Sequence, residues 1–210
     1  DFLGVDICYF IGRQNTITTI FNYIYSIFPN YKYYSATNDD FVYLTAVWDI
    51  KLMGDIEEMG GWGIAYGDDR IQSENMCTTS VVSGNIVKAL GWLQLPSLKH
   101  LYGDNVWKTI GMAIGRLRYD NNVVIQHKHP IDNKTAPDKI YKITNSNQMY
   151  SIDREAFIRW TKTQVKFDIA KIINAIFKEK KFDKSISLCM IIKQTESIKD
   201  IKTCLDSVKE

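Results

Sequence analysis

The stretch that decides the fold runs from residue 47 to residue 69 and reads VWDIKLMGDIEEMGGWGIAYGDD. Its first part, 47–59, predicts a helix, and the two glycines that follow predict where that helix ends. Residues 63–66 are short and apolar, as expected of a buried strand. The strand runs directly into Gly67-Asp68-Asp69, so two carboxylates lie just beyond its end. A helix, a buried strand and an acidic loop in succession are typical of an α/β fold.

The same alternation of elements continues on both sides of this stretch. Apolar runs bounded by glycine, proline or polar residues predict further strands, and apolar residues at helical spacing predict further helices. The polar stretch 131–149 is expected to be irregular. We therefore expect an α/β fold with a mixed sheet flanked by helices. The predicted strands are 5–11, 31–35, 122–127 and 185–192, and the predicted helices are 17–28, 83–90, 106–117, 165–176 and 198–208.

Composition narrows the class of protein. The chain has 210 residues, of which 45% are hydrophobic and 24% charged, as in ordinary globular domains. The net charge of +2 is too small to indicate binding to nucleic acid. No apolar run approaches the ~20 residues of a membrane span. The four cysteines lack the spacing of metal ligands, which favours a reduced setting, so we expect a cytoplasmic protein.

Acidic and histidine residues recur where predicted strands end. Asn38-Asp39-Asp40, Asp69, Asp104 and the pair His127 and His129 all occupy such positions. Ligands of open α/β sheets bind outside the carboxyl ends of the strands, so these side chains are site candidates. Two adjacent carboxylates can hold Mg²⁺ or Mn²⁺. The alternative is turn chemistry, because Asn and Asp also hydrogen-bond their own backbone in loops.

The other candidates also have two interpretations. Asp104 precedes a helical pattern, where a carboxylate serves as an N-cap and is also suited to act as a base. His127 and His129 lie two residues apart, so in an extended segment both face the same side, as metal ligands or as structural residues. The polar residues Gln72, Glu74 and Asn75 lie beside these loops in the sequence and are candidates to line a site. The aromatic Trp107 is a further candidate, and the alternative for it is packing in the core.

Three blocks of the sequence resemble one enzyme family. They are GIAYGDDRIQSENM at 63–76, LKHLYGDNVW at 98–107 and VVIQHKHP at 123–130. In this order they are similar to a branch of metal-dependent glycosyltransferases with the GT-A fold, related to family 2, over about residues 30–160. The resemblance implies a nucleotide-sugar donor, a divalent cation (Mn²⁺ or Mg²⁺), and transfer of a sugar to an acceptor hydroxyl with inversion.

The resemblance also implies a role for each candidate. Asn38-Asp39-Asp40 corresponds to the DxD element, with Asp40 as metal ligand, Asp39 near the donor, and Asn38 replacing the first Asp. Asp104 takes the place of the catalytic base. His127 or His129 takes the place of the late metal-binding histidine, and His129 is the preferred candidate. The expected acceptor-binding residues are Asp69, Gln72, Glu74, Asn75 and Trp107.

A second resemblance lies near the end of the chain. SLCMIIKQTE at 187–196 and CLDSV at 204–208 are similar to the first strand and helix of a family 2 glycosyltransferase. We therefore expect a transferase domain at 1–180, with a shortened front half, and the start of a neighbouring transferase domain at 185–210. A segment of a tandem enzyme explains this order. A permuted domain, or a terminal unit that pairs with another chain, explains it as well.

Three functions remain open on the sequence alone. The first is a metal-dependent glycosyltransferase, with a nucleotide sugar and a glycan or other hydroxyl acceptor as partners. The second is a non-catalytic GT-A-like module that binds a glycan or a protein partner, which Asn38 and the short front half favour. The third is a different metal-dependent α/β enzyme that acts on phosphate esters.

Overall fold

The computed structural model describes residues 15–37, 40–128 and 139–179. All of them belong to one compact unit that ends at Glu179. The strand predicted at 5–11 and the strand and helix predicted within 185–210 lie outside the described residues.

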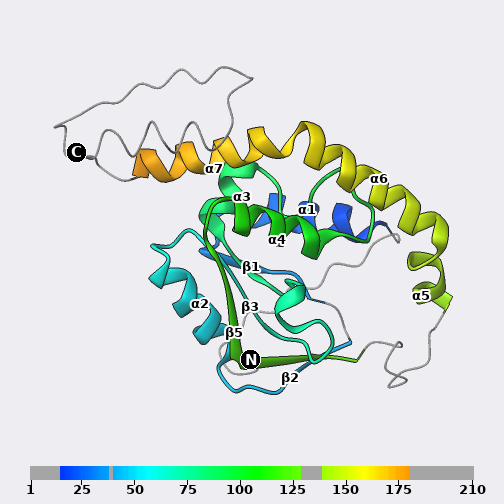
Figure 1. The fold of residues 1–210 in the computed structure, drawn as a ribbon, viewed down its shortest axis with the longest axis horizontal. Helices are drawn as coiled ribbons and strands as arrows, with labels where there is room; N and C mark the ends of the chain where they lie inside the picture. Colours follow the sequence, from blue (N-terminus) through cyan, green and yellow to red (C-terminus); the bar gives the residue numbers. More distant parts are fainter. Residues whose placement is uncertain (1–14, 38–39, 129–138, 180–210) are drawn as a thin grey trace. The chain divides into compact units, whose positions relative to one another are not determined.

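The centre of this unit is a mixed sheet of five strands in the order β1-β4-β3-β5-β2 (Figure 1). Strands β3 and β5 pair in parallel, and every other neighbouring pair is antiparallel. The α/β class and the mixed sheet predicted from the sequence are confirmed. The strands are β1 (Tyr33–Ser35), β2 (Phe41–Tyr43), β3 (Ile64–Asp68), β4 (Val81–Ser83) and β5 (Leu117–His127).

Helices flank the sheet, and local signals explain where several begin and end. Thr16 caps the first helix by accepting from the Thr19 amide, and Gly91 ends α3 with a left-handed φ of 80°. The helices are α1 (Ile17–Ile27), α2 (Trp48–Glu58), α3 (Gly84–Leu90), α4 (Gly103–Ala113), α5 (Lys139–Thr144), α6 (Asn147–Thr163) and α7 (Val165–Glu179), with a 3₁₀ turn η1 (Ser73–Asn75).

The two faces of the sheet carry separate apolar clusters. Ile64 and Tyr66 of β3 pack with residues of α3, α4, α6 and α7, whereas Ala65 packs with Leu52 and Ile56 of α2. This follows from the period of two along a strand. In Figure 1, α2 lies on one side of the sheet, and α3, α4 and α7 lie on the other. The sheet is therefore a middle layer between two layers of helices, and loops lie at the ends of its strands.

The structure corrects two predictions and adds three elements that were not predicted. The helix expected to reach Leu117 ends at Ala113, because Gly115 adopts a left-handed φ of 64°, and Leu117 begins β5 instead. The stretch expected to be irregular contains α5 and the start of α6. Helix α6 was not predicted, since the buried Asp153 interrupts its apolar face. Strands β2 and β4, three residues each, were also missed.

Within the described residues, no helix has the length and apolarity that crossing a membrane requires.

Candidate functional site

The acidic loop, residues 68–78, leaves the sheet where β3 passes very close to β5. The parallel register shifts between Gly67, opposite Asp120, and Asp68, opposite Val124. A Cβ atom at Gly67 would overlap the backbone carbonyl oxygen of Val123. Glycine is therefore required here for close backbone approach rather than for an unusual φ. This contact sets the direction in which the acidic loop leaves the sheet.

Asp69 organises the acidic loop from inside. The residue is only 2% exposed. Its Oδ1 accepts hydrogen bonds from the amides of Ile71, Gln72 and Ser73 at 2.9, 2.7 and 2.9 Å, and its Oδ2 accepts from the Thr78 hydroxyl at 3.1 Å. Both carboxylate oxygens are thus engaged within the loop. Asp69 was expected to contact an acceptor, but in this structure it supports the loop instead.

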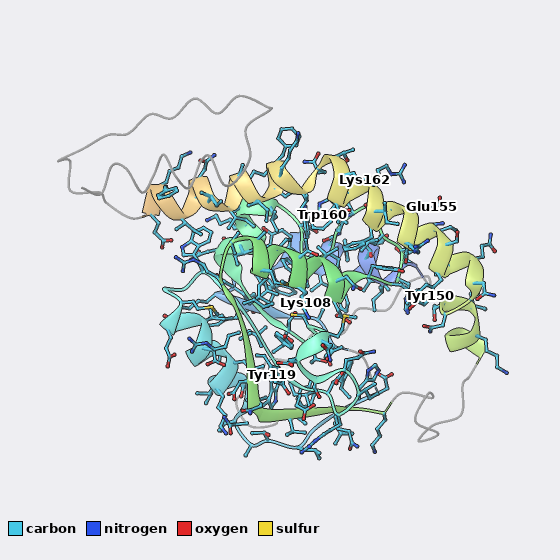
Figure 2. The ribbon with its side chains drawn as sticks, in the orientation of Figure 1. Lys108, Tyr119, Tyr150, Glu155, Trp160 and Lys162 are labelled. Atoms are coloured by element: carbon cyan, nitrogen blue, oxygen red, sulfur yellow. The ribbon has the colours of Figure 1, made fainter. Side chains whose placement is uncertain are left out.

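The acidic loop is also held from α4 and from the sheet. The Lys108 ammonium donates to the carbonyl oxygens of Glu74 and Asn75 at 3.0 and 2.7 Å, and the Tyr66 hydroxyl donates to Glu74 O at 2.8 Å. Figure 2 shows Lys108 on α4 close to the loop. The loop contains two non-glycine residues with positive φ, Arg70 (64°) and Ser73 (47°), and Thr79 (46°) follows directly after it. Such strain persists only where surrounding contacts enforce it.

Asp40 and His127 meet beside the acidic loop, although 87 positions separate them in the sequence. The Nε2 atom of His127 lies 3.1 Å from Oδ2 of Asp40, and the ring stacks on Phe41 with centroids 4.3 Å apart. Backbone bonds fix both residues, because Lys128 N donates to Asp40 O and His127 N donates to Asp69 O. The pairing of β2 with β5 therefore brings the acidic loop and the Asp40–His127 pair to one end of the sheet.

The remaining oxygen of Asp40 is the observation that bears on a metal. Among the described residues, Oδ1 of Asp40 is buried and has no hydrogen-bond partner. A buried carboxylate oxygen without a partner is costly, and a cation would satisfy it. A carboxylate and an imidazole are suitable ligands for Mn²⁺. The described residues contain no group of three or more His, Cys, Asp or Glu side chains placed to hold a metal ion. Asn38 and Asp39, next to Asp40, and His129, close to His127, lie outside the described residues.

Asp104 lies in the first turn of α4. The N-cap is Tyr102, at a left-handed φ of 68° and without a side-chain capping bond, so the expectation that Asp104 is itself the N-cap was wrong. Residue 104 is exposed when taken as a whole, yet its carboxyl group has dense protein around it. This burial, together with repulsion from Asp69, raises the pKa of Asp104 to about 7, although a helix N-terminus favours the charged form. Within the described part of the chain, its carboxyl group makes no hydrogen bond.

The other predicted site residues divide into two groups. Gln72, Glu74 and Asn75 are exposed on and beside η1, where their side chains are open to a ligand. Trp107 is 3% exposed and packs near Trp92, with ring centroids 5.6 Å apart. In this structure its ring is part of the core, and its contact with an acceptor stays a prediction.

The sequence analysis missed two further residues of the site, Lys108 and Cys77. Lys108 lies four positions after Asp104 on α4, so both share one helix face, and this spacing is visible in the sequence. Cys77 lies close enough to Asp104 to interact with it electrostatically, and burial raises the pKa of its thiol. The Cys77 thiol is therefore neutral, and it packs beside the site rather than acting as a nucleophile. No sequence pattern identifies that proximity.

Comparison of the chain with protein-family models, with curated proteins and with solved structures gives no match.

Proposed function

We propose that this chain is a metal-dependent, inverting glycosyltransferase with a GT-A-like fold, or the catalytic part of one. The single observation that carries the proposal is the convergence of Asp40, His127, the acidic loop and Asp104. These residues come from separate parts of the sequence that resemble the family. Hydrogen bonds link Asp40 to His127 and His127 to Asp69, and Asp69 interacts electrostatically with Asp104.

The donor side of the proposed site consists of Asp40 and His127. These two residues would hold the divalent cation, with the unpartnered Oδ1 of Asp40 as an available ligand atom. When bound, such a cation supplies charge that offsets the charge developing on the diphosphate leaving group. The stacking of His127 on Phe41 restricts its ring, so that the imidazole is already oriented for its role.

The acceptor side consists of Asp104 and the exposed face of η1. A general base works best when its pKa lies near the operating pH, and the pKa of Asp104 is about 7. Its carboxylate takes the proton of the acceptor hydroxyl as that oxygen attacks the sugar. Asp69 holds the Gln72 amide, and Lys108 holds the carbonyl oxygens of Glu74 and Asn75. Burial and, after it, the charge of Asp69 raise the pKa of Asp104.

The test is calorimetric titration of the chain with nucleoside diphosphates, once with Mn²⁺ and once with a chelator. We expect binding only with the metal, and Asp40→Ala should weaken it by at least about tenfold. The matched control is Asp49→Ala, which removes an exposed carboxylate from α2. Asp104→Asn should leave nucleotide binding intact while abolishing transfer. Equal affinity in the Asp40→Ala variant and the wild type would contradict the metal assignment.

A second candidate is a non-catalytic module of the same fold. It is favoured by the lack, among the described residues, of a complete group of metal ligands, and by Asn38 in place of a carboxylate. This candidate predicts no metal-dependent nucleotide binding by the folded chain. The same calorimetric experiment therefore separates the two candidates.

A further inference from the structure

A recess of about 300 Å³ has a lining that includes none of the residues assigned to the donor or to the base. It is formed by the start of α1, the segment before α4, the end of α5 and the start of α6. In Figure 2, Tyr150, the residue after Met149, marks the α6 side. The recess is lined by Asn15, Thr16, Lys99, His100, Ile143, Thr144 and Met149.

The polar groups of this recess that lack partners are mostly hydrogen-bond donors. Within the part of the chain that the structure describes, the Lys99 ammonium, the His100 ring and the Asn15 amide nitrogen make no hydrogen bond. The two hydroxyl groups are already engaged, Thr16 with Thr19 at 2.7 Å and Thr144 with Asn145 at 3.3 Å. A ligand that satisfies this lining must therefore offer several acceptor oxygens.

The charge around the recess also favours an anion. Among the described residues, its lining contains one lysine and no carboxylate. The recess adjoins the N-terminus of α1, an 11-residue helix with no acidic residue in its first turn, and that end of a helix attracts negative charge. Burial lowers the pKa of His100, against the opposing charge of Asp153, which favours the neutral ring. Among the described residues of the lining, the positive charge therefore comes from Lys99.

Asp153 holds the Lys99–Leu101 segment rigidly in place behind the recess. Its side chain is fully buried and accepts hydrogen bonds from the backbone amides of Lys99, His100 and Leu101 at 2.8, 2.8 and 2.7 Å. These three hydrogen bonds stabilise the buried carboxylate, and they fix the backbone that carries the side chains of Lys99 and His100. The backbone that carries Lys99 and His100 is thus preorganised, which reduces the entropic cost of binding a ligand.

We propose that this recess binds the phosphate group of a small organic molecule, with Lys99, His100 and Asn15 as its donors. Its volume is several times that of a phosphate, and Ile143 and Met149 offer apolar surface to the remainder of the molecule. The site does not depend on the transferase proposal, because it shares no residue with it.

The experiment is a ¹H–¹⁵N NMR titration of the whole chain with inorganic phosphate and, separately, with glycerol 3-phosphate. Constant ionic strength removes general salt effects, and a chelator silences metal-dependent nucleotide binding at Asp40. We expect saturable shifts of the amides around Lys99 and His100, with tighter binding of glycerol 3-phosphate. Lys99→Met should weaken binding at least about tenfold, whereas Lys99→Arg should retain most of it.

The matched control is Lys88→Met, which removes an exposed lysine from α3. Its affinity should equal that of the wild type. Absence of saturable shifts at this segment, or equal affinity in Lys99→Met and Lys88→Met, would overturn the proposal. Equal affinity for the two probes would overturn its organic part and leave a site for free phosphate. Thermal unfolding of each variant verifies that the fold is retained.

Discussion

Asp69 and Asp104 are two carboxylates of one site in opposite environments. Asp69 accepts four hydrogen bonds and is nearly inaccessible to solvent. Asp104 makes no hydrogen bond within the described residues, and its pKa is raised to about 7. A carboxylate whose oxygens are all engaged stabilises a loop, whereas one left unengaged among protein atoms is available to exchange a proton. Hydrogen-bond saturation therefore distinguishes the acid that supports the loop from the proposed base better than acidity or location does.

The largest expected effect tests the structural carboxylate. Asp69→Ala leaves three loop amides and the Thr78 hydroxyl without their acceptor, so we expect the free energy of unfolding to fall by about 3 kcal/mol or more. Urea denaturation measures this loss. Asp49→Ala, on the exposed face of α2, should change stability by less than about 0.5 kcal/mol. A loss for Asp69→Ala as small as that control would mean that the acidic loop does not depend on this carboxylate.

An intermediate effect is expected from moving the acidic loop without altering a carboxylate. Gly67→Ala forces a Cβ atom into the Val123 carbonyl oxygen, and because backbone cannot yield easily we expect destabilisation by about 2 kcal/mol. Gly54→Ala in α2 is the matched control. Nothing lies within 4 Å of its added Cβ, so it should stabilise the protein by about 0.5–1 kcal/mol. Both values come from thermal or urea unfolding, and a neutral Gly67→Ala would contradict the close approach of β3 to β5.

The smallest effect sharpens the description of the reactive carboxylate. The pKa of Asp104 rises from its ordinary value of 3.8 to about 7, so between these values the folded protein holds a proton that the unfolded chain lacks. Stability should therefore fall as the pH rises from about 4 to about 7, by about 1 kcal/mol after solvent screening. Asp104→Asn should remove that decrease. Urea denaturation at several pH values measures it, and identical pH profiles for the variant and the wild type would contradict the raised pKa.

The sequence predicted much of this fold where local signals are strong. Pro29 after α1, the glycines 60 and 61, and Gly91 mark element ends through residue chemistry that acts over a few positions. Helix α6 escaped prediction because Asp153 occupies a buried position where an apolar residue is expected. Asp153 is buried there because its carboxylate accepts hydrogen bonds from the amides of residues 99–101, more than fifty positions earlier.

The candidate site was predicted in its residue types but not in its division of labour. Asp40, Asp69, Asp104 and His127 were all identified, and the structure brings them to neighbouring positions. That Asp69 supports a loop and that Trp107 belongs to the core depends on burial. A linear pattern does not specify which oxygen finds a donor, so it does not separate a structural carboxylate from a reactive one.

The sequence by itself determined the α/β class, the helices with clear caps and the residues that carry chemistry, because each depends on periodicity or on the chemistry of a short segment. Only the tertiary structure decided that Asp40 faces His127 across 87 positions, that β3 and β5 run in parallel, and that Asp104 keeps an unengaged carboxyl group. The physical reason is that strand pairing, burial and electrostatic coupling are interactions between distant segments, and they exist only once the chain has folded.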